Sequence, residues 1–362
     1  MVAARDWSTA AEVLCVRLDT IGDVLMTGPA MRALRESGAR PRITLLTSKP
    51  GASAARLMPE VDETIVYEAP WMKRGEHPSS AAADRAMIEG LRARRFDAAA
   101  IFTVYTQSAL PAALMCRLAD VPLRLAHCRE KPYGLLTHHV AEREPEEHVR
   151  HEVRRQLDLV AAVGATAADE RLRVRVPRAA RARATAAIAA LGVDEERAWT
   201  VVHPGASAPS RRYPEEQWAE VCRRLETDHG VQVVLSGDAG EAALAAGIAR
   251  AAGLPDRSLA GRLALPELAA LLEAAPLLLA GNTGPVHLAA AVGTPVVDLY
   301  ALTNPQHTPW GVPSKVLSHD VPCRWCLGSV CREGHHLCLR AVEPAEVVRA
   351  ALAVGKFRLL TA

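Results

Sequence analysis

The 362-residue sequence has few aromatic residues (4%), almost no net charge (+2) and no long uninterrupted apolar run. The small net charge excludes a strong field for nucleic acid, and the scarcity of aromatics removes the stacking platforms of RNA-binding surfaces. The most apolar stretch, 263–281, contains Glu267, Glu273 and two prolines, so we expect it not to span a membrane. With 49% hydrophobic and 23% charged residues, the composition is that of a soluble globular protein.

Several phosphate-binding motifs are also missing. No GxGxxG follows the first strand-like run, and the GxxxxGK[ST] pattern of P-loops is absent. The chain also lacks an Asp-x-Asp pair, the usual cradle for a divalent cation on a sugar diphosphate. We therefore expect any bound diphosphate to be met by arginines and helix N-termini rather than by a metal ion.

The first residues, MVAARDWSTAAEV, carry charges where a secretory signal would need an apolar core. We therefore expect a cytoplasmic protein. In a reducing compartment, clustered thiols are expected to be metal ligands rather than disulfides. Four scattered cysteines in apolar or helical context are predicted to be small core residues, namely Cys15, Cys116, Cys128 and Cys222.

Strand-like apolar runs alternate with helical patterns in two series along the chain. This alternation is typical of parallel sheets with helices on both faces. We expect an α/β protein with two Rossmann-like, doubly wound domains that face each other across a cleft, where ligands bind at the carboxyl ends of the strands. The domain boundary is predicted near 178. The strand-like runs include 13–18, 42–48, 98–104, 200–205, 231–237, 276–281 and 295–300.

The stretch RLDTIGDVLMTGPAMRALRES (17–37) places Asp23 where a strand passes through a glycine turn into a helix. There the helix dipole and backbone N–H groups favour an ionised carboxylate, which can accept a proton from an attacking hydroxyl. The alternative is that Asp23 only caps its helix. Asp19 is a weaker candidate for the same role.

Two further stretches are predicted to bind an anion. In VVHPGASAPSRRYPEEQW (201–218), the small residues Gly205 and Ser207 permit close backbone approach, and Arg211 adds a cation. The alternative is a basic surface loop. In AGNTGPVHLAAAVGTPVVDLY (280–300), a helix begins just after a buried strand and offers its first N–H groups. The residues there are Asn282, Thr283, Gly284 and His287, of which His287 is alternatively a satisfied core histidine.

Four cysteines fall in CRWCLGSVCREGHHLC (323–338), with the spacing C-x2-C-x4-C-x6-C. Such a set fits a tetrahedral structural metal site, for which zinc is the first candidate. The expected ligands are Cys323, Cys326, Cys331 and Cys338. Four protein ligands leave no position for water or substrate, so we expect the metal to brace the loop rather than take part in chemistry. Replacement of one thiol by His335 or His336, and reduced free thiols, are the alternatives.

The stretches RLDTIGDVLMTGPAMRALR, HPGASAPSRRYPEEQW and GNTGPVHLAAAVGTPVVDLY together resemble glycosyltransferase family 9, the heptosyltransferases of lipopolysaccharide core assembly. The resemblance implies a GT-B fold in which domain 1–178 holds the acceptor and domain 179–342, including the cysteine-rich segment, holds the donor. The last segment, 343–362, is expected to form a helix that crosses back to the N-terminal domain. Because some relatives are thought to hold iron in a similar finger, iron is an alternative to zinc.

The resemblance also implies an inverting transfer that needs no metal and no catalytic cofactor, commonly from ADP-L-glycero-D-manno-heptose to a saccharide such as the lipopolysaccharide inner core. By position, Asp23 matches the catalytic base, and Asn282 stands where many members carry an aspartate. Matching donor contacts are Ser207 and Arg211 for phosphate, Glu241 for ribose, the Leu263 backbone for adenine, and Thr283, Gly284 and His287 for phosphate and sugar.

The acceptor side is less specific. HCREKPYGLLTH (127–138) offers Arg129 and Lys131 to an anionic acceptor such as a phosphorylated or Kdo-bearing headgroup, unless it is a plain surface loop. A lipid-borne acceptor would favour peripheral contact with the inner face of the inner membrane. Two other functions stay open: a GT-B nucleotide-sugar epimerase, and a non-enzymatic zinc-knuckle interaction module on a nucleotide-binding scaffold.

Overall fold

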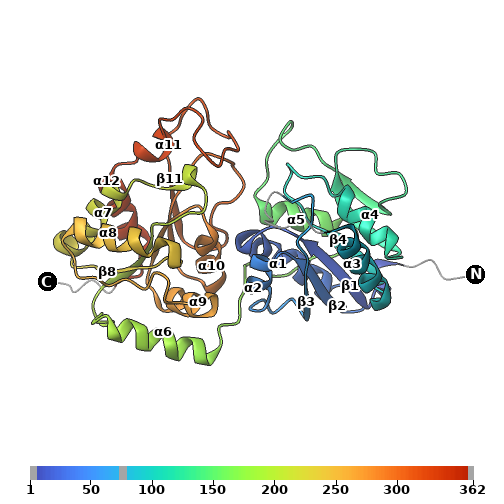
Figure 1. Ribbon diagram of the computed structural model, residues 1–362, viewed down its shortest axis with the longest axis horizontal. Coiled ribbons are helices and arrows are strands. Elements are labelled where there is room, and N and C mark those ends of the chain that lie inside the picture. Colours follow the sequence, from blue (N-terminus) through green and yellow to red (C-terminus); the bar gives the residue numbers. More distant parts are fainter. Residues whose placement is uncertain (1–5, 73–79, 358–362) are drawn as a thin grey trace, which may run out of the picture. The chain divides into compact units, whose positions relative to one another are not determined.

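The computed structural model describes residues 6–72 and 80–357, and the chain divides into two compact units, Met1–Arg173 and Val174–Ala362 (Figure 1). Each unit is an α/β structure around one parallel sheet, which confirms the predicted fold class. The predicted boundary at 178 lies a few residues beyond the observed one. The arrangement of the two domains across a cleft stays a prediction.

The described residues of the first unit form a six-stranded parallel sheet in the order β3-β2-β1-β4-β5-β6. The order reverses beside β1, which is where doubly wound sheets place their ligand sites. The elements are η1 (Trp7–Thr9), β1 (Glu12–Arg17), α1 (Ile21–Glu36), β2 (Arg42–Thr47), α2 (Lys49–Ala55), β3 (Glu63–Val66), α3 (Ala81–Arg94), β4 (Ala98–Ile101), α4 (Leu110–Leu118), β5 (Leu123–Cys128), β6 (His138–Ala141) and α5 (Glu152–Ala161).

Alternation along β1 sorts its side chains between the two faces of this sheet. Leu14 and Val16 join the apolar cluster that contains residues of α3 and α4. Because successive strand residues point to opposite faces, Cys15 and Arg17 lie on the face covered by α1 and α5. Helices α1 and α5 pack against each other there. This face therefore receives a buried guanidinium, at the end of the strand that precedes Asp23.

The second unit contains a five-stranded parallel sheet in the order β11-β10-β9-β7-β8 among its described residues. Its elements are α6 (Arg178–Ala190), β7 (Trp199–His203), η2 (Pro209–Arg211), α7 (Glu215–His229), β8 (Gln232–Leu235), η3 (Ala239–Glu241), α8 (Ala242–Ala252), α9 (Leu265–Ala274), β9 (Leu278–Gly281), α10 (Gly284–Val292), β10 (Val296–Leu299), β11 (Ser314–Leu317), α11 (Leu337–Arg340) and α12 (Pro344–Val354). The predicted order of strands and helices is confirmed in both units.

Helix α12 forms within the predicted C-terminal segment, 343–362. It packs against α7, β10 and β11, and its apolar side, including Val347 and Ala351, belongs to the core of the second unit. The sequence predicted a helix here, and the structure shows one that packs on the sheet of the second unit. Its crossing back to the N-terminal domain stays a prediction. Residues 358–362 of the predicted segment lie outside the described residues.

Two composition-based expectations also meet the structure. The four scattered cysteines are buried, as predicted, at Cys15, Cys116, Cys128 and Cys222. Among the helices in residues 6–72 and 80–357, none combines the length and the apolar character that crossing a membrane requires.

Candidate functional site

Asp23 occupies the first turn of α1, at the carboxyl end of β1. One carboxylate oxygen, Oδ2, accepts hydrogen bonds from the Thr20 backbone N–H (3.3 Å) and from the Thr20 hydroxyl (3.2 Å). The other oxygen, Oδ1, lies 3.3 Å from Nη2 of Arg17. The side chain is 18% exposed. Asp23 therefore caps its helix, as one reading predicted, and still presents a partly exposed carboxylate beside a cation.

Arg17 is fully buried and contacts three carboxylates at once. Its Nε lies 2.8 Å from Asp19, its Nη1 2.7 Å from Glu152, and its Nη2 reaches Asp23. Glu152, the first residue of α5, is also fully buried and accepts from the side chain of Gln156 at 2.7 Å. A single cation thus faces three carboxylates, so the cluster keeps a net negative charge when every carboxylate is ionised.

Burial sets the protonation of this cluster. It raises the pKa of Asp19 to about 6, although the Arg17 charge acts in the opposite direction. The pKa of Arg17 is lowered by burial, but the three carboxylates outweigh that effect and raise it overall. Arg17 therefore stays charged, and a proton is held at Asp19 below about pH 6.

Sequence reasoning missed Arg17 and Glu152 as members of the site. A cation inside the apolar run VLCVRL was a signal that a buried counter-charge must exist, because an unpaired buried guanidinium is costly. Nothing in the sequence said that the counter-charge would come from Glu152, 135 positions away.

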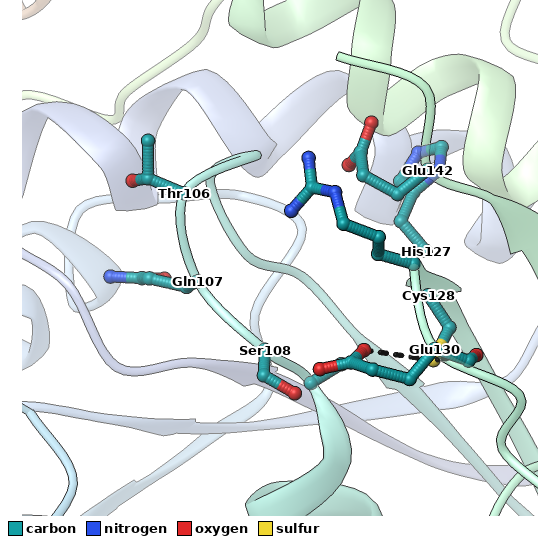
Figure 2. Close-up of a pocket in the computed structure, with 9 residues that line it drawn as sticks. Thr106, Gln107, Ser108, His127, Cys128, Glu130 and Glu142 are labelled. Carbon is teal, nitrogen blue, oxygen red and sulfur yellow. Dashed lines mark hydrogen bonds between the residues drawn. The ribbon is translucent and has the colours of Figure 1, made fainter. Parts of the chain in front are cut away.

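A pocket of about 180 Å³ lies at the same edge of the first sheet (Figure 2). Its lining comes from residues 106–109 after β4, from 127–130 at the end of β5, and from Glu142 after β6. Gln107 connects it to the charged cluster, because its side-chain amide donates to Asp19 Oδ1 at 2.7 Å. The carboxyl ends of β1, β4 and β5 thus carry one continuous polar site.

The two predicted acceptor residues are placed differently. Arg129 lines the pocket, and its guanidinium donates to the backbone carbonyls of Tyr105 (3.3 Å) and Glu144. Lys131 is not among the lining residues, and its ammonium lies 5.5 Å from the centre of the exposed Tyr133 ring. Only the arginine is brought to the pocket, and it also ties two loops together.

In the second unit, the loop after β7 brings two predicted donor residues into contact. A Cβ added at Gly205 would lie 1.9 Å from a carboxylate oxygen of Glu241, so any other residue there would require the Glu241 side chain to move. Glu241 Oε2 lies 3.6 Å from Nε2 of His203 and accepts from the Asp238 backbone N–H at 2.9 Å. Burial raises the pKa of Glu241. Ser207, by contrast, is exposed.

The residues around the start of α10 are also brought together. Arg211 donates from Nη1 to the backbone carbonyl of Asn282 at 3.4 Å, and a Cβ at Gly281 would lie 2.9 Å from the Arg211 carbonyl oxygen. Thr283 is the N-cap residue and Gly284 the first residue of the helix. The cation is therefore held beside a helix N-terminus, an arrangement suited to phosphate.

For the two remaining predicted donor residues, His287 and Leu263, the structure gives the position in the fold. The ring of His287 is buried in the first turn of α10 and stands edge-on to His307, with centroids 6.5 Å apart. Leu263 lies in the loop that precedes α9. Their contacts with a nucleotide sugar stay predictions.

Asp298 is a buried acid that sequence reasoning overlooked in PVVDLY. It lies on β10 and is fully buried, and both of its carboxylate oxygens lack a hydrogen-bond partner in the described part of the chain. Burial raises its pKa well above the ordinary value, and the Arg211 charge only partly offsets this. Burial therefore disfavours the ionised form of this carboxyl group, although the charge of the predicted phosphate-binding cation acts on it.

The cysteine-rich segment is attached to the donor-side loop. The Ser210 hydroxyl donates to the Gly328 carbonyl (2.7 Å), and the Ser210 N–H donates to the Ser329 carbonyl (3.0 Å). The Trp325 N–H donates to the Leu302 carbonyl beyond β10 at 2.7 Å. The segment therefore lies next to Arg211, as the position of the predicted metal loop suggested.

The thiols themselves do not form a closed ligand set. Cys323 Sγ lies 3.8 Å from Nε2 of His335. Burial raises the pKa of Cys338, and the other three thiols are close enough to raise it further. In residues 6–72 and 80–357, however, no group of three or more His, Cys, Asp or Glu side chains is arranged to hold a metal ion. The donor chemistry fits zinc or iron, and the placement of the side chains does not.

We expect Arg17→Ala to destabilise the first unit by about 3–5 kcal/mol, because it leaves the buried Glu152 carboxylate without its partner. Hydrogen exchange of peptides from β1 and α5 measures this within the unit. Arg92→Ala is the control, since that side chain is 41% exposed and its loss should leave the protection almost unchanged. Equal protection in the two variants would show that Arg17 does not organise this face.

We expect Asp298→Asn to stabilise the second unit at pH 8 and to have little effect near pH 4. The folded state keeps a proton that the unfolded chain releases above about pH 4, so the wild-type protein loses stability as the pH rises toward the raised pKa. Scanning calorimetry at both pH values checks this. Asp320→Asn, at a side chain 74% exposed, should show no such pH dependence.

Comparison with known proteins supplies the family. Residues 85–337 match the family model of glycosyltransferase family 9 (heptosyltransferase). Lipopolysaccharide heptosyltransferase 2 of Escherichia coli K12 is 26% identical over 308 residues, which span 82% of this chain and 85% of that protein. Lipopolysaccharide heptosyltransferase 1 of Pseudomonas aeruginosa is 37% identical over 133 residues, about a third of either chain (35% and 36%).

Solved structures give the same fold. The family 9 glycosyltransferase of Veillonella parvula superposes with a TM-score of 0.81 at 20% identity, covering 98% of this chain and 99% of that one. The E. coli ADP-heptose heptosyltransferase II superposes with a TM-score of 0.73 at 24% identity, covering 95% of this chain and 98% of that one. The iron-containing dodecameric glycosyltransferase TibC of enterotoxigenic E. coli superposes with a TM-score of 0.52 at 14% identity, covering 95% of this chain and 76% of that one.

These neighbours carry the GT-B fold, which confirms that prediction, and the family model spans well over half of the chain. The match decides for a glycosyltransferase over the epimerase and the non-enzymatic module. The chain belongs to glycosyltransferase family 9, the heptosyltransferase family.

Proposed function

We propose that the protein transfers a heptose from ADP-heptose to a saccharide acceptor such as the lipopolysaccharide inner core. Its relatives, which include lipopolysaccharide heptosyltransferases and an ADP-heptose heptosyltransferase, support the donor and acceptor classes. The observation that carries the chemistry is the partly exposed Asp23 carboxylate, fixed by Thr20 and faced by the buried Arg17.

The proposed reaction is a single displacement that inverts the anomeric centre. Asp23 removes the proton from the acceptor hydroxyl as its oxygen bonds to the anomeric carbon. The bond from that carbon to the donor phosphate breaks, and its electron pair leaves with ADP. Arg17 stabilises the carboxylate before the transfer, and Asp19 shares the same guanidinium.

The donor side of the proposal uses the second unit. Arg211 and the N–H groups at the start of α10, those of the N-cap residue Thr283 and of Gly284, stabilise the charge that develops on the departing diphosphate. Asn282 and His287 are proposed to contact phosphate and sugar, and Ser207 the phosphate. No metal ion is required in this scheme, because an arginine and backbone amides meet the charge.

The remaining donor contacts concern the nucleoside. Glu241 is proposed to accept from the ribose hydroxyls, and the backbone at Leu263 to meet the adenine. The Gly205 site allows Glu241 to lie directly against the loop backbone. On this proposal, residues 179–342 form the donor-binding domain and residues 1–178 the acceptor-binding domain, which offers Arg129 and Lys131.

Two further properties belong to the proposal. The protein works in the cytoplasm, in peripheral contact with the inner face of the inner membrane, because a lipid-borne acceptor resides there. The four thiols of residues 323–338 hold a structural zinc or iron ion once their side chains close around it. The iron-containing TibC supports iron as a candidate. The ion would brace the loop bonded to Ser210 and take no part in transfer.

We expect Asp23→Asn to lower kcat by about 10²–10⁴-fold while the dissociation constant for ADP-heptose stays unchanged, because the amide cannot accept the proton. ADP release in the presence of heptose-free lipopolysaccharide measures turnover, and calorimetry measures donor binding. Asp19→Asn is the matched control, because Asp19 contacts the same guanidinium. We expect it to lower kcat less than Asp23→Asn does, and to change the dependence of kcat on pH near pH 6. The reverse ranking of the two variants would assign the base to Asp19.

We expect the purified full-length chain to contain one zinc or iron ion, measured by plasma mass spectrometry. Cys326→Ser should lower both the metal content and the melting temperature of the second unit, because structural metal binding contributes folding free energy. Cys222→Ser, at a buried core thiol, is the control and should leave the metal content unchanged. Metal-free protein from metal-supplemented cultures would mean that the thiols are free.

A further inference from the structure

Glu152 is joined to the candidate base through the guanidinium of Arg17. Arg17 Nη1 lies 2.7 Å from Glu152 Oε1, and Arg17 Nη2 lies 3.3 Å from Asp23 Oδ1. The side chains of Arg17 and Glu152 are both fully buried, whereas the Asp23 side chain is 18% exposed. Glu152 is therefore shielded from any substrate, and an effect of its charge on the transfer must pass through this cluster.

The position of Glu152 is fixed by its helix and by a second hydrogen bond. It is the first residue of α5, which packs against α1, the helix that carries Asp23 (Figure 1). Its Oε1 also accepts from the Gln156 side chain at 2.7 Å. The same amide nitrogen donates to the Thr103 carbonyl, just beyond β4, at 3.0 Å. The carboxylate therefore has a fixed place in the core, and it fixes one edge of the Arg17 guanidinium.

Arg17 shares its charge unequally among three carboxylates. Its contacts with Glu152 (2.7 Å) and Asp19 (2.8 Å) are shorter than its contact with Asp23 (3.3 Å). An arginine that faces a single aspartate holds that carboxylate in the ionised form and makes it a weak base. Here two further carboxylates face the same guanidinium, and their negative charges oppose that effect. Asp23 therefore accepts a proton more readily than the aspartate of an isolated pair would.

The other ionisable side chains on the elements around Glu152 do not replace Arg17 as its partner. Tyr105 and His127 are neutral at pH 7, because burial raises the pKa of the phenol and lowers the pKa of the ring to about 4. Arg155 is ion-paired with a different glutamate. The groups in question include Arg17 and Asp19 at the end of β1, Asp23 on α1, Tyr105 after β4, His127 on β5, and His151 and Arg155 at the start of α5.

We propose that Glu152 is a positioning residue for the transfer. From within the core it takes up part of the Arg17 charge, so that Arg17 orients the Asp23 carboxylate without making it too weak a base for the acceptor proton. The inference rests on the proposed function, in which Asp23 removes that proton. It adds to that function a buried residue of α5 that touches neither donor nor acceptor.

The first test removes the charge of Glu152 and keeps its shape. In Glu152→Gln the amide oxygen can still accept from Arg17, and the guanidinium keeps two carboxylates, so we expect the variant to fold. We expect the acid limb of the kcat/KM profile for heptose-free lipopolysaccharide to move down by about 0.5–1 pH unit. At pH 8, kcat should fall about 2- to 5-fold with an unchanged KM for ADP-heptose. A lower kcat with the acid limb in place would indicate a structural role and overturn the proposal.

Glu60→Gln is the matched control, because it also removes the charge of a buried carboxylate that is paired with an arginine of the first unit. Glu60 is ion-paired with Arg32, which lies further along α1 than Asp23, and the two side chains are 3% and 5% exposed. We expect this variant to lose stability, measured by its melting temperature, and to keep the acid limb of the wild-type protein. An equal shift of the limb in both variants would contradict a role specific to Glu152.

Glu152→Asp is a milder change for the same measurement. It keeps the charge and withdraws it from Arg17 by about 1.5 Å, one carbon–carbon bond. We expect the acid limb to move in the same direction as in Glu152→Gln, by about half as much. A shift toward higher pH would overturn the proposal.

Direct titration of Asp23 separates this inference from the proposed function. Carbon-13 NMR of the side-chain carboxyl groups follows the protonation of Asp23 in the full-length chain without any substrate. We expect Asp23 to titrate at lower pH in Glu152→Gln than in the wild-type protein. That result without turnover of ADP-heptose would leave the assignment of Glu152 standing and remove the donor proposal. Turnover of ADP-heptose with an unmoved titration of Asp23 would keep the transferase and overturn the inference.

Discussion

The first unit is organised around one buried positive charge. Arg17 stands at the end of the central strand, where taking a guanidinium out of water is tolerable only because three carboxylates converge on it. These come from the turn after β1, from the first turn of α1 and from the start of α5. One ion cluster therefore fixes the strand end, the helix that carries Asp23 and the helix that closes the unit.

In the second unit, close contacts with the backbone of two glycines position the polar groups at the strand ends. Glycines at 205 and 281 let the Glu241 carboxylate and the Arg211 backbone lie where any side chain would intrude. Asp298 is buried on the neighbouring strand, and burial raises the pKa of its carboxyl group. The Arg211 cation thus lies beside the start of α10, near a carboxyl group whose ionised form is disfavoured.

Much of this could be predicted from the sequence, for physical reasons. Central parallel strands are apolar on both faces, so runs such as VVH and LLLAG were visible, and the glycine turn before Asp23 indicated a helix start. The partners of single side chains were not visible. An amphipathic pattern predicts that α12 packs against a sheet, but it does not predict which sheet. A buried arginine predicts a buried carboxylate partner, but it does not identify that partner as Glu152.

Helix α12 completes the core of its own unit, so each unit draws its sheet and covering helices from one uninterrupted stretch of chain. The first unit takes all the strands and helices described for it from residues before 174. It can therefore acquire its buried Arg17 cluster while the second unit is still being synthesised, and the order of translation can serve as the order of folding.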